Sequence, residues 1–252
     1  MNVDPLGGLT MAAFAGFTDN DFKGIAGTTW RGRDALGGML AADLRHSVGP
    51  DTRSWGVRRR PELHIARSSH YDFAEPRSYA KLFVYTWGND CEDGDEEDGD
   101  ELAYGLFVEG KRDDDANYPH WRNFRERLRT SDGLSAALFA AMEEHRLIVA
   151  DYNQRYNRYN RGGALGDQFR SHRGAFQSSP PGKPAWRDCS REDMIDRLIS
   201  MQGEHEWIDL HVFAQMDKAA AVKLGPEVVK PVLLVLESLV PVYRAMIASP
   251  TA

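Results

Sequence analysis

The triplet Glu109-Gly110-Lys111 ends a strand-like apolar run and has the spacing of a catalytic strand motif. Side chains two residues apart on a strand lie on the same face, so the carboxylate and the ammonium group would act together. In metal-dependent nucleases such a Glu and an upstream Asp hold Mg²⁺, while the Lys stabilises the attacking hydroxide. The upstream acid here would be Asp90 or Asp100. A charged strand exit without catalysis is the alternative interpretation, and Gly110 favours it because glycine weakens a strand.

The segment from Asp151 to Gln177 carries five arginines against two acids, with aromatic residues between them. Guanidinium groups match phosphate oxygens, and tyrosine rings offer stacking faces to unpaired bases. We therefore predict that this segment contacts nucleic acid. The residues expected to do so are Arg155, Arg158, Arg161, Arg170, Arg173, Tyr156 and Tyr159. A solvated loop whose arginines neutralise acids elsewhere in the chain is the alternative.

A second basic cluster and an acidic run complete the charge pattern. Arg58, Arg59 and Arg60 are consecutive, and we predict that they add to the same nucleic-acid surface. Residues 89–101 contain nine acids and no basic residue, which exceeds the net charge of −7 of the whole chain. We predict a disordered hairpin loop there and, as a hypothesis, a phosphate mimic that folds back on the arginine segment.

Other catalytic and cofactor motifs are missing from the sequence. The only Gly-Lys pair, Gly182-Lys183, precedes Pro184 instead of Ser or Thr, which excludes a P-loop. Neither cysteine belongs to a Cys-x-x-Cys pair, and no Gly-x-Ser-x-Gly occurs. We therefore predict no cofactor and no bound metal for the leading interpretation.

The elements that position these residues are predicted from hydrophobic spacing. Strand patterns cover residues 63–68, 79–87, 102–109, 146–152 and 207–214. Helical patterns lie within 17–48 and over 119–130, 133–145, 190–202 and 217–225, and a long C-terminal helix over 227–248 contains Pro241. The predicted fold class is α+β, with a central antiparallel or mixed sheet flanked by helices.

The predicted domain organisation follows from these elements. Residues 1–176 form an α+β domain that includes the acidic hairpin loop 89–101 and the basic segment 151–176. Strands 79–87 and 102–109 pair as antiparallel neighbours across the acidic loop. Residues 177–189, rich in Ser, Pro and Gly, are a linker, and residues 190–252 pack on the same core.

The composition and the apolar stretches of the chain predict its cellular compartment. The chain has 252 residues, of which 42% are apolar and 27% charged, as in a soluble protein. Its first residues do not have the pattern expected of a signal peptide, and its longest apolar stretch, 231–242, is too short to span a bilayer. We predict a cytoplasmic protein with free thiols and no membrane partner.

Several packing motifs resemble a known group of proteins. They are Tyr-Gly-Leu-Phe at 104–107, the Trp/Phe helix at 119–130, Trp-Ile-Asp-Leu at 207–210 and Leu-Val-Pro-Val-Tyr at 239–243. These are similar to N-terminal regions ahead of the AAA+ motor in McrB-type restriction GTPases and related defence ATPases. The resemblance implies a region that selects modified or foreign DNA, while motor and nuclease lie elsewhere. Residues 15–27 also resemble the opening of small bacterial proteins of the YktB type, and neither resemblance supplies a catalytic residue.

The sequence thus predicts a non-enzymatic nucleic-acid recognition module, with DNA as the first choice, in a bacterial defence or DNA-processing system. Its expected partners are nucleic acid and a separate motor or nuclease subunit, and a homo-oligomer stays open. The first alternative is a Mg²⁺-dependent nuclease that uses Glu109, Lys111 and Asp100. The second is a protein-interaction or oligomerisation scaffold without nucleic-acid binding.

Overall fold

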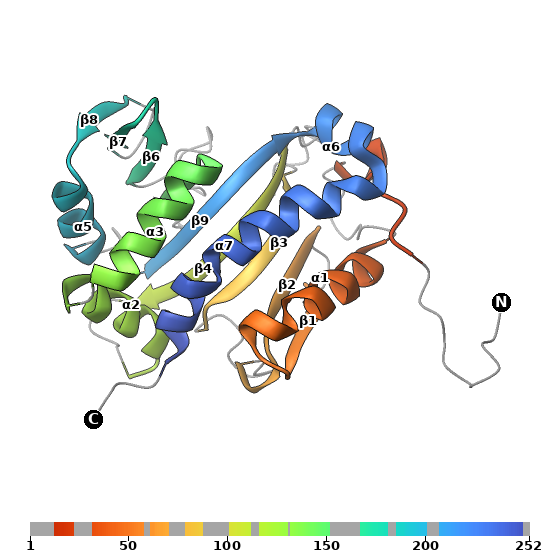
Figure 1. Cartoon of the computed structure of the whole chain (residues 1–252), viewed down its shortest axis with the longest axis horizontal. Coiled ribbons are helices and arrows are strands. Elements are labelled where there is room, and N and C mark those ends of the chain that lie inside the picture. Colours follow the sequence, from red (N-terminus) through yellow and green to blue (C-terminus); the bar gives the residue numbers. More distant parts are fainter. Residues whose placement is uncertain are drawn as a thin grey trace.

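Nine strands form one antiparallel sheet in the part of the chain that the structure describes (Figure 1). The structure is a computed structural model, and it describes residues 13–22, 32–57, 61–70, 79–87, 101–111, 116–130, 132–151, 167–180, 185–200 and 207–248. The strands are β1 (Thr52–Gly56), β2 (Glu62–Arg67), β3 (Lys81–Trp87), β4 (Glu101–Lys111), β5 (Ile148–Asp151), β6 (Gln168–His172), β7 (Ala175–Ser179), β8 (Arg187–Cys189) and β9 (Trp207–Asp217).

The strand order places the last strand of the chain near the middle of the sheet. The order is β1-β2-β3-β4-β9-β5-β6-β7-β8, so β9 joins the hairpins before it to those after it. β4 and β9 pair over eleven residues each, from Glu101 opposite Asp217 to Lys111 opposite Trp207. The two halves of the sheet are therefore joined only when residues distant in the sequence pair with each other.

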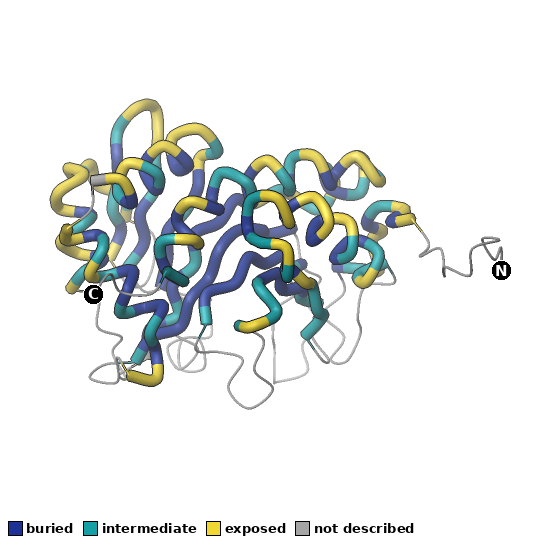
Figure 2. The backbone as a smooth tube through the Cα atoms, turned by 60° about the horizontal axis from the view of Figure 1, so that its bottom comes forward, coloured by how far each residue is buried: buried dark blue, intermediate teal, exposed yellow. Residues whose placement is uncertain are grey.

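The α-helices cover one face of this sheet (Figures 1 and 2). Two capping interactions start helices where the sequence predicts them: Ser190 and Asp193 form a reciprocal capping box, and Asp217 accepts from the Ala220 N–H at 2.7 Å. The helical elements are η1 (Asp19–Phe22), α1 (Arg33–Val48), η2 (Ser68–His70), α2 (Pro119–Thr130), α3 (Asp132–His145), α5 (Arg191–Ser200), α6 (Lys218–Leu224), η3 (Gly225–Val228) and α7 (Val229–Ile247).

The main core lies between the helices and the sheet, and α7 runs through its centre. α7 packs against β4, α1, α2 and α3, and it continues through Pro241. Tyr243 of α7 is buried, and its hydroxyl accepts from the Arg67 N–H of β2 at 3.2 Å. Asn123 of α2 donates to the Met246 carbonyl at 2.8 Å, which satisfies the end of α7.

The predicted fold class is confirmed, and so is most of its element order. The sheet is antiparallel, the last helix is long, and β3 and β4 pair as neighbours on either side of the acidic run. Residues 89–100 of that run lie outside the described residues, so the predicted loop disorder stays a prediction. Its last acid, Glu101, opens β4 and accepts from the Gln215 side chain at 2.6 Å. None of the described helices is long and apolar enough to cross a membrane.

The sequence patterns miss four strands: β1, β6, β7 and β8. β6 and β7 form a hairpin that begins within the predicted basic segment 151–176, and β8 lies within the predicted linker 177–189. The linker therefore includes the end of β7 and all of β8, and it is part of the sheet rather than only a connection. These strands have three to five residues and many polar side chains, so no alternation marks them.

Gly110 has a packing reason that its sequence context hides. A Cβ at this position would lie 2.5 Å from Cγ and Cδ1 of Trp121, whose side chain is 1% exposed. Because Gly110 has no side chain, the indole ring of Trp121 on α2 packs directly against the β4 backbone.

We expect Gly110→Ala to destabilise the fold by about 1–3 kcal/mol, because the indole ring is fully packed and cannot move aside. Urea denaturation of the purified protein measures this loss. In a Trp121→Leu background the same glycine change is expected to cost less. An equal cost in both backgrounds would show that contact with Trp121 is not the reason.

Candidate functional site

Polar side chains gather on the sheet face that the described α-helices leave uncovered. Alternation along the strands assigns this face, because Phe107 and Phe213 belong to a small cluster separate from the helical core. Three of the four consecutive strands β2-β3-β4-β9 each place two ionisable side chains on this face. They are Glu62 and His64 on β2, Glu109 and Lys111 on β4, and Asp209 and His211 on β9.

Two of these strands carry a carboxylate–imidazole pair, and the two pairs flank one phenylalanine. The Glu62 Oε1 atom lies 2.5 Å from the His64 Nε2 atom, and Asp209 Oδ1 lies 3.5 Å from His211 Nδ1. The His64 ring centroid is 5.4 Å from that of Phe107. The His211 ring stacks on the same Phe107 at 5.2 Å and 15°. Both imidazole rings therefore lie against Phe107, but the two pairs do not combine into one metal-binding group among the described residues.

His211 is held in its neutral form. Its side chain is 18% exposed, and burial lowers its pKa to about 4, against the opposing effect of the hydrogen bond to the Asp209 backbone. Its Nδ1 lies 3.3 Å from the Asp209 carbonyl, which can only accept, so Nδ1 carries the proton. The other ring nitrogen is then a hydrogen-bond acceptor at neutral pH.

Lys81 adds a buried cation to the same face. It is 1% exposed, and its ammonium group lies 4.9 Å above the centroid of the Phe107 ring, a cation–π contact. The register pairs Lys81 directly with Phe107, so strand pairing fixes this contact.

The predicted nuclease residues fall on this face with a different acid from the expected one. Glu109 is buried and stands opposite Asp209 in the β4–β9 register, with Lys111 on the same side. Asp100, the acid predicted from the sequence, lies outside the described residues. Among those residues, no group of three or more His, Cys, Asp or Glu side chains is placed to hold a metal ion. The arrangement thus supplies an acid pair and a lysine.

Asp151, at the end of β5, supports the Asp209 backbone. Its carboxylate accepts from the Asp209 N–H at 3.0 Å. Burial raises the pKa of Asp151 to about 7, and the nearby Asp167 adds to the rise.

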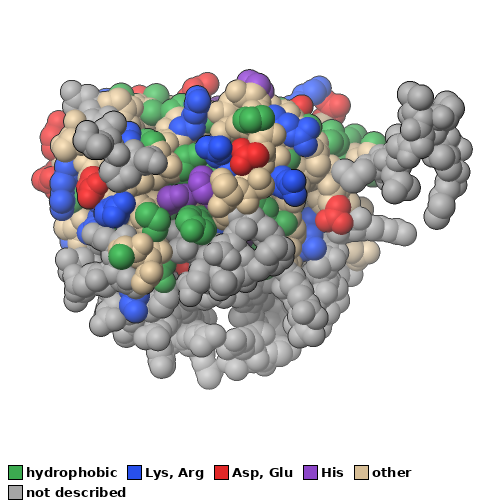
Figure 3. All heavy atoms as spheres, turned by 90° about the horizontal axis from the view of Figure 1, so that it is seen from below, with side chains coloured by type: hydrophobic (Ala, Val, Ile, Leu, Met, Phe, Trp, Pro, Cys, Tyr) green, Lys and Arg blue, Asp and Glu red, His purple; other side chains and the backbone are tan. Residues whose placement is uncertain are grey.

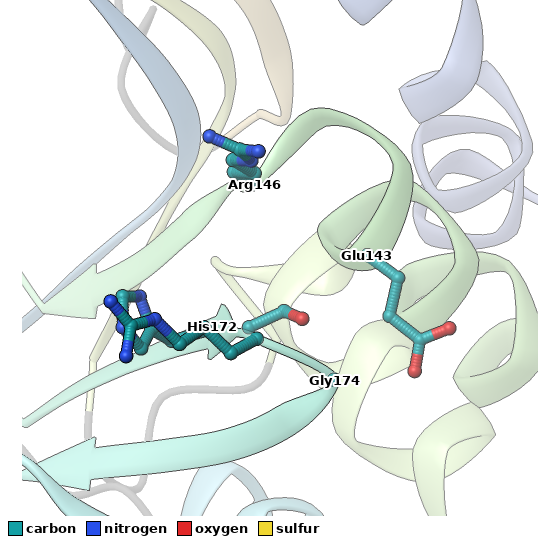
Figure 4. Close-up of a pocket in the computed structure, with 6 residues that line it drawn as sticks. Glu143, Arg146, His172 and Gly174 are labelled. Carbon is teal, nitrogen blue, oxygen red and sulfur yellow. The ribbon is translucent and has the colours of Figure 1, made fainter.

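A second candidate site is a hollow of about 460 Å³ beside the tip of the β6–β7 hairpin, which we call the arginine hollow. It brings together the end of α3 and the hairpin, as Figure 4 shows. Its lining residues are Glu143, Arg146, Ser171, His172, Arg173 and Gly174.

The arginine hollow is positively charged. Arg146, His172 and Arg173 are exposed, and none of them has a hydrogen-bond or ion-pair partner among the described residues. The one acid, Glu143, is bound by Arg191 at 2.6 Å, and its carboxylate points away from Arg146 and His172 (Figure 4). Partner-free guanidinium groups in a concave surface are suited to an anion.

Both arginines have left-handed backbone conformations. Arg146 (φ 54°) and Arg173 (φ 52°) are the two non-glycine residues with positive φ in the described part of the chain. Arg146 follows α3, whose end closes when the Leu147 N–H donates to the Met142 carbonyl at 3.2 Å. Arg173 and Gly174 form the two-residue loop of the β6–β7 hairpin. A left-handed conformation costs a non-glycine residue about 1–2 kcal/mol.

Arg170, predicted as a phosphate contact, is engaged within the protein. Its guanidinium lies 4.1 Å from the centroid of the Trp186 ring, and its Nε donates to Gln177 Oε1 at 3.0 Å. Arg173, from the same prediction, lines the arginine hollow. The structure thus separates two arginines that are three residues apart into a stacked one and an exposed one.

The remaining predicted nucleic-acid residues lie outside the described residues, and their roles stay predictions. They are Arg58, Arg59, Arg60, Arg155, Tyr156, Arg158, Tyr159 and Arg161.

Comparisons with protein-family models, with curated proteins and with solved structures found no match to this chain. The resemblance to McrB-type and YktB-type regions therefore stays a prediction.

Sequence reasoning missed several residues of both sites. The Asp209-x-His211 spacing on a predicted strand was a usable signal, because it repeats Glu62-x-His64. Arg146 carried no local signal, because only the packing of α3 beside the β6–β7 hairpin brings it to Arg173. His172 precedes Arg173 directly in the chain, and its place in the hollow follows from the hairpin itself.

We expect His211 to lower the free energy of unfolding as the pH drops from about 6.5 to 4. His120, whose pKa burial lowers to about 3, acts in the same direction, and Asp151, whose pKa is raised to about 7, acts in the opposite one. In this range the unfolded chain binds a proton at His211 that the folded protein does not, which costs about 2 kcal/mol at pH 5 from this group alone. His211→Gln should remove this contribution from the pH dependence in urea denaturation, whereas His46→Gln, at an exposed position on α1, should leave the pH dependence unchanged. An unchanged pH dependence in the His211 variant would contradict the assignment.

Proposed function

We propose that this protein recognises nucleic acid through the surface around the arginine hollow. The observation that carries the proposal is the convergence of Arg146, His172 and Arg173 on one concave site without internal partners among the described residues. Charged groups left without internal partners are available for an external anion, and phosphate is the anion that arginine binds best.

The neighbouring hairpin supports the proposal. Arg170 and Trp186 form a stacked pair on β6 and before β8, next to the hairpin that carries Arg173. An indole ring backed by a guanidinium offers a stacking surface for a base. The predicted contacts at Arg155, Arg158 and Arg161, and at Tyr156 and Tyr159, belong to the same proposal.

The biological setting is proposed on the sequence alone. The protein would act in the cytoplasm as the recognition part of a bacterial defence or DNA-processing system, with DNA as its ligand and a separate motor or nuclease subunit as its partner. In this role it is not itself an enzyme.

The Arg146→Ala/Arg173→Ala double variant should weaken oligonucleotide binding by about tenfold or more, since each change removes a charge-assisted contact. The slope of log K against log salt should also become shallower by about 1–2. Fluorescence anisotropy over a salt series measures both. Arg45→Ala, at an exposed position on α1, is the matched control and should bind like the wild type. Binding that ignores salt, or that the double variant retains, would overturn the proposal.

A second candidate function is a metal-dependent nuclease on the helix-free sheet face. The observation in its favour is the cross-strand placement of Glu109 opposite Asp209, with Lys111 on the same side. Two carboxylates and a lysine in this arrangement are the minimum for Mg²⁺-assisted hydrolysis of a phosphodiester.

If this candidate is right, Glu109→Gln should abolish Mg²⁺-dependent cleavage of DNA or RNA, because a neutral amide holds a divalent cation poorly. Glu101→Gln, at the other end of β4, is the control and should cleave normally. The candidate fails if the wild type shows no cleavage with Mg²⁺ or if cleavage survives Glu109→Gln.

A further inference from the structure

The two arginines of the arginine hollow occupy backbone positions where arginine is unfavourable. Arg173 is the first residue of a two-residue hairpin loop in which both φ angles are positive, and Asn-Gly is the preferred sequence there. Arg146 occupies the position after a helix that glycine prefers. The dipole of α3 favours a cation at its end and accounts for Arg146. It does not account for Arg173, which lies in a hairpin loop.

We propose that the arginine hollow binds a terminal phosphate group, the phosphomonoester at the end of a nucleic-acid strand. The inference rests on the proposed nucleic-acid function and makes its ligand specific. Arg173 and Arg146 would hold the phosphoryl oxygens, and His172 and Ser171 would complete the set of donors.

Charge favours a phosphomonoester over an internal phosphodiester. A terminal phosphate has three free oxygens and a charge near −2, whereas a diester has two free oxygens and a charge of −1. Two guanidinium groups, an imidazole and a hydroxyl in one concave site match the first more closely. The volume of about 460 Å³ also has room for the sugar or base that carries the phosphate.

The surroundings disfavour a continuous backbone. Glu144 is an exposed acid in the last turn of α3, next to Glu143 of the hollow, which is paired with Arg191. The Glu144 carboxylate would repel the next phosphates of a strand that ran across the hollow. The face seen from below in Figure 3 lies at the other end of the strands from the hollow, and its described Lys and Arg side chains are interspersed with Asp, Glu and apolar ones without a continuous basic track.

The test compares short single-stranded oligonucleotides that carry a 5′-phosphate, a 3′-phosphate or hydroxyl groups at both ends, by fluorescence anisotropy. We expect the full chain to bind one phosphorylated end about tenfold or more tightly than the hydroxyl form. Arg173→Asn should abolish this preference. Its melting temperature should stay equal or rise, because Asn-Gly suits the hairpin loop, and this separates lost binding from lost folding. Arg45→Ala should keep the preference.

The outcomes separate the two proposals. Equal, salt-dependent binding of all three oligonucleotides overturns the terminal-phosphate assignment and leaves nucleic-acid recognition standing. No binding of any oligonucleotide overturns both. A preference that survives Arg173→Asn overturns the assignment to the hollow. If inorganic phosphate displaces the phosphorylated oligonucleotide at equal concentration, the hollow is a site for free phosphate. That result overturns the assignment of its ligand to the end of a nucleic-acid strand.

Discussion

The pairing of β4 with β9 is the constraint on which the rest of the structure depends. It joins strands that are far apart in the sequence, and the two backbones approach so closely that a Cβ at Gly105 would lie 2.0 Å from the Val212 carbonyl oxygen. Only glycine fits such an approach. The pairing also sets the cross-strand neighbours of β4 and β9 on the helix-free face, such as Phe107 beside His211 and Glu109 beside Asp209.

The two faces of the sheet differ in physical character because of this pairing. The helical face buries aliphatic and aromatic side chains against α7 and its neighbours. The other face buries ionisable groups, and their free-energy cost is reduced by local contacts: His64 with Glu62, and Lys81 with the Phe107 ring. The arginine hollow differs from both faces. Arg146 and Arg173 have an unfavourable backbone conformation there, and their exposed charges have no partner among the described residues. A strained backbone next to an unpaired charge is more typical of a binding site than of a region that stabilises the fold.

Much of the fold follows from the sequence, whereas little of either site does. Helices α2, α3, α5 and α7 have clear apolar spacing or caps, and β3, β4 and β9 have long apolar patterns, so local physics determines them. The short strands β6 to β8 depend on their neighbours and carry no pattern of their own. Arg173 of the predicted arginine segment lines the hollow, and Arg146 joins it only through the packing of α3. Left-handed backbone at an arginine is a tertiary property that composition does not reveal.

The central claim is that an anionic group of nucleic acid sits in the arginine hollow, and amide chemical-shift mapping by NMR tests it most directly. On titration with a phosphorylated oligonucleotide, the account predicts the largest shifts at the end of α3, residues 143–147, and in the hairpin loop, residues 171–174. Amides of α1 should stay in place. Saturable binding that leaves the Gly174 and Leu147 amides unmoved would contradict the account.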